Sequence, residues 1–206
     1  MEHCNVAITP VEPRLHLSNN EDEKDVDPTQ YIRLIGSLHY LCNTRSDLAF
    51  SVSIVSRFTG IPKVSHLTTF KRILRYVKGF VGRRILFLAA DMDIKWNFLG
   101  FTDFNWWGDK DDRKSTTGYI FMFGGTPISW CSMKELVVAL SSCEVKYIVA
   151  LLCACQAMWV MNILKELGSS DGEAVTLLVD NVFAINLSKN PIVMGGASIL
   201  RRGFNS

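Results

Sequence analysis

The sequence predicts an α/β protein in which a region of helices precedes a mixed β-sheet with flanking helices. In residues 31–84, apolar side chains recur at the three- and four-residue spacing of amphipathic helices. From residue 85 onward, short apolar runs and turn signals predict a series of strands, then a long helix, a further strand and a short helix. The chain of 206 residues is 48% hydrophobic and 20% charged, so it can bury a core. This composition excludes wholesale disorder and a collagen-like fibre.

The helical region contains three helices by these criteria. The first starts at Asp27-Pro28, because proline is favoured at the first helical position. The second is expected over about residues 46–60, and the third over about residues 65–78. Residues 1–30 hold three of the six prolines and an acidic run, which predicts a linker without a core of its own.

The second half of the chain carries the strand signals. Gly124-Gly125 predicts a hairpin turn, and a long helix is expected over residues 141–167, ended by Gly168. This helix is long enough to cross a membrane, but Gln156 and Asn162 interrupt its apolar run, which favours a buried core helix. The expected strands are residues 85–88, 95–101, 119–123, 128–130 and 175–179, followed by a short helix at 181–188.

Two carboxylates follow strands of the predicted sheet. Asp103 comes after the strand that contains Phe101, and Asp180 comes directly after Val179. The carboxyl ends of parallel strands meet at one edge of a sheet, and rigid carboxylate oxygens are the ligands that Mg²⁺ requires. Alternatively, each aspartate caps the turn or helix that follows it. The spacing by itself leaves both interpretations open.

Basic residues gather on the third predicted helix. The net charge of +2 excludes a globally basic protein, but residues 57–84 contain eight basic residues and no acidic one. A basic stripe opposite an apolar face is suited to a phosphate backbone, whereas a solvated helix face is the ordinary alternative. The residues of this basic stripe are Lys71, Arg72, Arg75 and Lys78.

A series of motifs then makes the sequence recognisable. The downstream motifs are Gly100-Phe101-Thr102-Asp103-Phe104-Asn105-Trp106, Lys114-Ser115-Thr116-Thr117-Gly118-Tyr119, Ile128-Ser129-Trp130, Val138-Ala139-Leu140-Ser141-Ser142-Cys143-Glu144 and Asp180-Asn181. They resemble the ribonuclease H region of copia-type retrotransposon polyproteins. The upstream motifs, Leu34-Ile35-Gly36-Ser37-Leu38 and Lys71-Arg72-Ile73-Leu74-Arg75-Tyr76, are similar to the end of the reverse transcriptase of the same family. The resemblance covers about residues 6–193 in unbroken order.

The resemblance implies a ribonuclease H-like fold over residues 85–193, preceded by a small helical connection region at residues 31–84. It also implies four acidic residues that bind two Mg²⁺ ions and cleave RNA paired to DNA. Asp103 matches the first acidic position and Asp180 the third, which makes them the expected catalytic and metal-binding residues. The basic stripe would contact the RNA–DNA hybrid. An intact element would supply the rest of the Pol polyprotein as a partner.

Two departures from the family pattern concern the metal site. Lys146 occupies the second acidic position, and its ammonium would compete with Mg²⁺ for each aspartate with roughly 4 kcal/mol at an effective dielectric of about 20. Glu144 lies about 200° away around the helix, so it cannot simply take that place. The fourth acidic residue normally follows Asn190-Pro191, but no acidic residue occurs there.

Residues 194–206 no longer resemble the family. The family commonly continues there with His-Gly-Arg-Ser-Lys-His-Ile-Glu, and codons can be chosen for that run that a single-base shift turns into this tail. The hypothesis is one frameshift near Val193, which puts the lost glutamate in the codons of Leu200 and Arg201. We therefore expect the C-terminal helix of the fold to be missing.

These observations predict a ribonuclease H-like domain whose ancestral activity is Mg²⁺-dependent cleavage of RNA in RNA–DNA hybrids, and which is inactive in this copy. The alternatives are a non-catalytic nucleic-acid-binding module and a pseudogene translation without function. The N-terminus lacks the basic and apolar regions of a signal peptide. Together with the predicted core helix, this favours a cytoplasmic or nuclear protein without a membrane partner.

Overall fold

The structure, a computed structural model, describes residues 4–19, 22–82, 98–105, 114–135, 142–168, 175–179 and 197–201. The chain divides into two compact units. The first, here called the helical unit, consists mainly of residues 1–85, and the second, the sheet unit, takes most of residues 86–206. Each unit has its own hydrophobic core.

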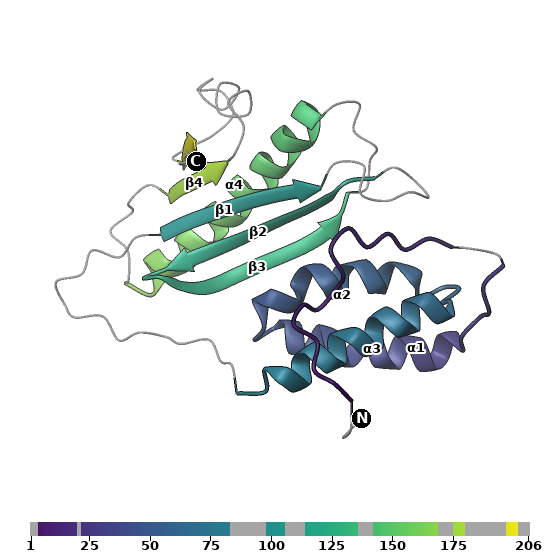
Figure 1. The fold of residues 1–206 in the computed structure, drawn as a ribbon. Helices are drawn as coiled ribbons and strands as arrows, with labels where there is room; N and C mark the ends of the chain where they lie inside the picture. Colours follow the sequence, from purple (N-terminus) through teal and green to yellow (C-terminus); the bar gives the residue numbers. More distant parts are fainter. Residues whose placement is uncertain are drawn as a thin grey trace. The chain divides into compact units, whose positions relative to one another are not determined.

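The helical unit begins where the sequence predicts. The Asp27 side chain accepts a hydrogen bond of 2.9 Å from the Thr29 amide, and Pro28 takes the first helical position. The second predicted helix is a short α-helix with a 3-10 turn at each end. The elements are α1 (Pro28–Cys42), η1 (Ser46–Leu48), α2 (Ala49–Val55), η2 (Ser56–Phe58) and α3 (Val64–Gly79) (Figure 1).

The core of the helical unit joins all three α-helices. Tyr31 is fully buried and its hydroxyl donates a hydrogen bond of 2.9 Å to the Val55 carbonyl, which ties α1 to α2. On α3 the most buried apolar residues are Phe70, Ile73 and Tyr76. The spacing predicts Leu67, Phe70, Leu74 and Val77 for that face; Phe70 is confirmed, whereas the other three side chains are only partly buried.

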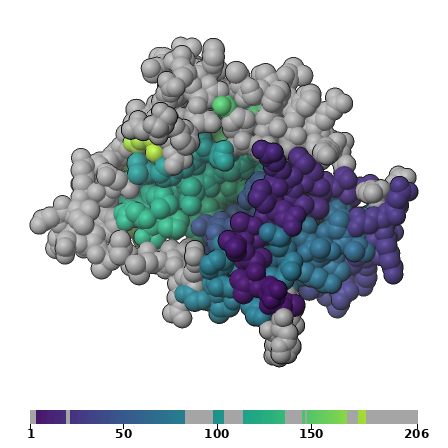
Figure 2. All heavy atoms as spheres, viewed as in Figure 1, coloured from purple at the N-terminus to yellow at the C-terminus, as the bar shows by residue number. Residues whose placement is uncertain are grey.

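The first residues of the chain differ from the predicted linker. Ala7 and Leu17 pack against the helical core. The Val26 amide donates to the Pro62 carbonyl at 2.8 Å, and the Val64 amide donates to the Lys24 carbonyl at 3.2 Å. We call this segment, residues 4–19 and 22–26, the N-terminal strap; Figure 2 shows its first residues, in purple, lying across the helical unit. Composition indicates little apolar burial here but does not reveal backbone hydrogen bonds made across the sequence.

The sheet unit contains one mixed sheet with the strand order β3-β2-β1-β4-β5 among the described residues. β1 pairs antiparallel with β2, and β2 with β3, whereas β1–β4 and β4–β5 are parallel. A parallel pair needs a crossover connection, and α4 provides it between β3 and β4 (Figure 1). The elements are β1 (Phe98–Asn105), β2 (Thr116–Phe123), β3 (Thr126–Lys134), α4 (Ser142–Glu166), β4 (Val175–Val179) and β5 (Ala197–Arg201).

Glycines set two of the boundaries. Gly124 and Gly125 have φ values of 55° and 80°, which suits the two-residue hairpin between β2 and β3. Gly168, with φ of 67°, follows the end of α4. Both agree with the predicted turn and helix end. The predicted strand at 85–88 and the predicted helix at 181–188 lie outside the described residues.

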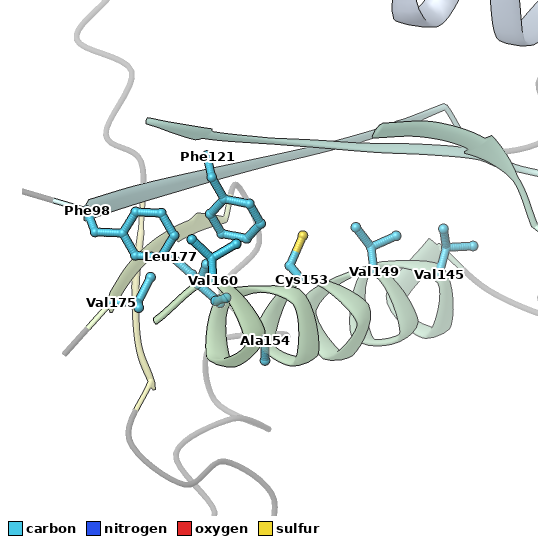
Figure 3. Close-up of a cluster of buried hydrophobic side chains, with 10 residues drawn as sticks. Phe98, Phe121, Val145, Val149, Cys153, Ala154, Val160, Val175 and Leu177 are labelled. Carbon is cyan, nitrogen blue, oxygen red and sulfur yellow. The ribbon is translucent and has the colours of Figure 1, made fainter. Parts of the chain in front are cut away.

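One face of α4 packs on the sheet and forms the core of this unit. Figure 3 shows Val145, Val149 and Cys153 of α4 pointing toward the strands, with the rings of Phe98 and Phe121 near Val160. At Gly100 on β1, an added Cβ would lie 2.5 Å from Leu177 Cδ2 and 2.6 Å from Phe121 Cε1, so only glycine fits the present packing.

The length and hydropathy of α4 would also suit a membrane span. Among the described residues, the stretch Ile148–Glu166 is long and apolar enough to cross a membrane, with a mean hydropathy of 1.7. Its buried face, however, belongs to the core of the sheet unit. This agrees with the predicted core helix.

Candidate functional site

Asp103 lies on the central strand of the sheet. It pairs in register with Gly118 of β2, and β4 runs parallel to β1 on the other side. The side chain is exposed to solvent. The sequence predicts that Asp103 follows the end of its strand. This is wrong, because β1 continues to Asn105 and Asp103 lies within it.

Asp180 lies outside the described residues, but its strand is described. β4 ends at Val179, and Leu178 pairs with Phe101 of β1. Chain connectivity alone keeps the Cα of residue 180 about 3.8 Å from that of Val179. The two strands that carry the predicted metal-binding aspartates are therefore adjacent and parallel, as the sequence predicts.

Lys146 occupies the beginning of α4. Its neighbour Val145 is fully buried against the sheet, whereas Lys146 itself is partly buried. Because Val145, Val149 and Cys153 all pack on the strands, the rotation of the helix about its own axis is fixed. A rotation of about 200° that would bring position 144 to the place of position 146 would remove this packing.

The tail contributes a strand that sequence reasoning missed. β5 pairs in parallel with β4, and Arg201 is in register with Val179. The frameshift hypothesis assigns the lost glutamate to the codons of Leu200 and Arg201, so the register places this position beside the end of β4. The short apolar pair Ile199-Leu200 is the signal that could have indicated the strand.

Metal-ligating side chains do not cluster in the described part of the chain. No group of three or more His, Cys, Asp or Glu side chains gathers there in a way that could hold a metal ion. Burial also raises the pKa of the Cys153 thiol to about 12 and that of Cys42 to about 11, which keeps both thiols protonated. Of the predicted ligands, the structure describes only Asp103.

The basic stripe is partly engaged within the helical unit. Lys71 is exposed, and Arg75 is partly buried with no hydrogen-bond partner for its Nε among the described residues. Arg72 forms an ion pair of 2.9 Å with Glu12 of the N-terminal strap. Lys78 Nζ donates a hydrogen bond of 3.1 Å to the Cys4 carbonyl. Two of the four predicted nucleic-acid contacts therefore have partners inside the protein.

A second polar cluster fixes the end of α3 that carries the basic stripe. Arg45 donates two hydrogen bonds to the Asp47 carboxylate, at 2.8 and 2.7 Å, and Tyr76 donates a third at 2.8 Å. The Arg45 guanidinium also donates to the Phe80 carbonyl at 3.3 Å. Hydrogen bonding from Arg45 holds the pKa of Asp47 below its ordinary value. The cluster joins the loop before α2 to the end of α3.

Comparison with known proteins places this fold and these residues in a wider context. No family model matches the chain, and no solved structure matches it significantly. The Retrovirus-related Pol polyprotein from transposon RE1 of Arabidopsis thaliana is 38% identical over 186 residues, which cover 90% of this chain and 12% of that protein. The Pol polyprotein from transposon TNT 1-94 of Nicotiana tabacum is 38% identical over 197 residues, covering 92% and 14% of the two chains.

A shorter relative matches over much of its own length. The Secreted RxLR effector protein 161 of Plasmopara viticola is 37% identical over 113 residues, which cover 54% of this chain and 78% of the effector.

The two polyprotein matches and the structure together describe a retroelement-type protein with a mixed α/β fold. The chain is homologous to copia-type retrotransposon Pol polyproteins, and it spans only about an eighth of the length of the polyproteins it matches.

Proposed function

We propose that the chain corresponds to the ribonuclease H segment of a Pol polyprotein with its preceding connection region. The observation that supports this most strongly is the sheet: Asp103 lies on a central strand beside the parallel strand that Asp180 follows. Adjacent parallel strands lie about 4.8 Å apart, which brings two such aspartates to one edge. The ancestral activity of this segment is Mg²⁺-dependent cleavage of RNA in RNA–DNA hybrids.

We further propose that this copy does not cleave. The position that should provide a carboxylate from α4 holds Lys146, and position 201 on β5 holds an arginine. Each replaces a negative charge by a positive one at the metal-binding edge, so both changes favour expulsion of a divalent cation. The buried Val145 fixes the rotation of α4, so position 144 stays about 200° around the helix from position 146. We therefore derive no metal-dependent step for this chain.

Cleavage of a labelled RNA–DNA hybrid in Mg²⁺ tests this proposal. We expect no metal-dependent hydrolysis from the wild-type chain, and none from Lys146→Glu alone, because the carboxylate from β5 remains absent. Asp103→Asn is the matched control for contaminating nuclease. Robust cleavage by the wild-type chain that Asp103→Asn abolishes would contradict the loss of activity.

A second candidate function is non-catalytic binding of nucleic acid by the helical unit. The observation in its favour is the position of Lys71, Arg75 and Lys78 on α3, opposite the residues that α3 buries, such as Ile73. Each cation that contacts a phosphate contributes about −0.9 to the slope of log affinity against log salt concentration. Replacement of Lys71 and Arg75 by glutamine should therefore flatten the slope by about two units. An unchanged slope would mean that these residues only solvate the helix.

A further inference from the structure

The N-terminal strap follows α3 along its whole length in the opposite direction. Near the start of α3, the Glu23 carboxylate accepts a hydrogen bond from the Ser65 amide, and Lys63 pairs with Asp25 at 2.7 Å. Near its end, Lys78 bonds to the Cys4 carbonyl. A helix of 16 residues is about 24 Å long, so the contacts span several turns.

The part of the strap near the start of α3 is firmly attached. His66 is fully buried and stacks on Phe58 with ring centroids 3.9 Å apart. Its Nδ1 accepts a hydrogen bond of 2.9 Å from the Lys63 amide, so its Nε2 is the protonated nitrogen and donates to the Ser18 carbonyl at 3.2 Å. The backbone hydrogen bonds of Lys24 and Val26 add to this anchor.

The part near the end of α3, residues 4–12, is held mainly by polar contacts at the surface. Arg72 donates to the Thr9 carbonyl at 3.3 Å and to the Thr9 hydroxyl at 3.1 Å, besides its ion pair with Glu12. The Glu12 side chain is 64% exposed in that pair. Val6 and Ile8 are 52% and 85% exposed, so this part buries little apolar surface. Exposed ion pairs contribute little to stability and weaken with salt.

We propose that residues 4–12 of the N-terminal strap act as an intramolecular competitor for the nucleic acid that α3 binds. The carboxylate of Glu12 and the carbonyl oxygens of Thr9 and Cys4 occupy Arg72 and Lys78 as phosphate oxygens would. Lys71 and Arg75 make no described contact with the strap, so they remain available for the initial contact with nucleic acid. Release of residues 4–12 then gives the phosphate backbone all four cations, while the anchor at His66 keeps the strap attached. This inference rests on the proposed nucleic-acid binding.

A disulfide can hold the strap closed. A Cβ built on Gly79 lies 3.4 Å from the Cβ of Val6, close to the separation of about 3.5–4.5 Å in disulfides. The test uses the full chain with Val6→Cys and Gly79→Cys, in a Cys4→Ser background that removes the nearest native thiol. Affinity for an RNA–DNA hybrid is measured against salt concentration in the oxidised protein and again after reduction of the same sample.

We expect the oxidised form to bind roughly tenfold more weakly than the reduced form, with a salt slope smaller by about two units, because two phosphate contacts are blocked. A second variant, Thr9→Val with Glu12→Gln, opens the strap without touching a cation and should bind more tightly than wild type. The control is Glu2→Gln, which removes one negative charge from the N-terminal segment of the sequence without changing Thr9 or Glu12.

The outcomes separate the two proposals. Equal affinities and slopes for the oxidised and reduced forms, in a protein whose binding depends on salt and on Lys71, would overturn the competitor and leave the binding function intact. No salt-dependent binding by any form would overturn both. An opened variant that binds no better than the Glu2→Gln control would likewise contradict the competition.

Discussion

The helical unit and the sheet unit keep their structures by different means. In the helical unit, polar contacts join distant parts of the chain: Arg45 and Tyr76 share Asp47, and Arg72 reaches Glu12 across 60 residues. In the sheet unit, the core is an apolar layer between α4 and the strands. Substitutions at the sheet edge therefore change the chemistry there without touching this layer. The apolar layer of the sheet unit does not depend on the residues of the sheet edge, whereas the basic face of α3 is part of the network that holds the helical unit.

Removal of a core aromatic ring should have the largest effect on stability. Phe121 is fully buried between β2 and α4, and Phe121→Ala should lower the free energy of unfolding of the sheet unit by about 3–5 kcal/mol. Denaturant titration measures this. Phe50→Ala in α2, where the ring is 44% exposed, is the matched control and should cost less than about 1 kcal/mol. Equal losses would mean that the apolar layer does not dominate the sheet unit.

The next prediction concerns Mg²⁺ binding by variants with added carboxylates in the sheet unit. On the proposal that Lys146 and Arg201 stand at former carboxylate positions, Lys146→Glu combined with Arg201→Glu should produce Mg²⁺ binding, because it replaces two positive charges by two negative ones. With 10-fold excess of Mg²⁺ over its dissociation constant, the gain in stability is about 1.4 kcal/mol. Thermal unfolding with and without Mg²⁺ measures it, and the wild type should show no such gain. A wild type that gains as much as the double variant would contradict the loss of the site.

A single buried hydrogen bond tests the junction of α1 and α2. Tyr31→Phe removes the bond to the Val55 carbonyl and should cost about 1 kcal/mol. Tyr40→Phe on the same helix, where the ring is 78% exposed, serves as the control and should have no measurable effect. Burial raises the pKa of Tyr31, so its hydroxyl stays protonated and donates throughout the alkaline range in which an exposed tyrosine ionises.

The smallest expected effect concerns pH. Because the pKa of Asp47 is lower in the folded protein, its contribution to stability is complete above the unfolded pKa of about 4 and is lost as pH falls through the folded value. Asp47→Asn should cost at most about 1 kcal/mol at pH 7, since solvent reaches the pair. The difference in stability between wild type and variant should shrink as pH is lowered below 4. A difference that is constant down to pH 2 would contradict this role.

The sequence predicts the elements whose signals are local. Pro28 marks the start of α1, Gly124-Gly125 the hairpin and Gly168 the end of α4, because each needs only the backbone preference of its own residue. The parallel pairing of β1 and β4 follows from the strand order and the crossover helix. The motifs around Asp103 indicated the family, which the comparisons confirm.

The sequence does not predict contacts between residues that are far apart in the chain. In the sequence, nothing distinguishes Arg72 and Glu12 from two separate charges in solvent. Only the path of the strap brings them together as an ion pair. The face of α3 that is most buried differs from the predicted one by about one residue, because Ile73 and Tyr76 pack on neighbours that apolar spacing does not specify. β5 was missed because the tail was judged by its lost resemblance to the family, although its apolar pair suffices to pair with β4.

The most direct test of what the chain retains is the salt dependence of its affinity for an RNA–DNA hybrid. Wild type is compared with a variant in which Lys71, Arg72, Arg75 and Lys78 are replaced by glutamine, with circular dichroism to verify that α3 is still folded. The account predicts weaker binding and a slope flatter by up to about four units, since each phosphate contact contributes about 0.9. A folded variant with an unchanged slope would contradict the claim that the basic face of α3 binds nucleic acid.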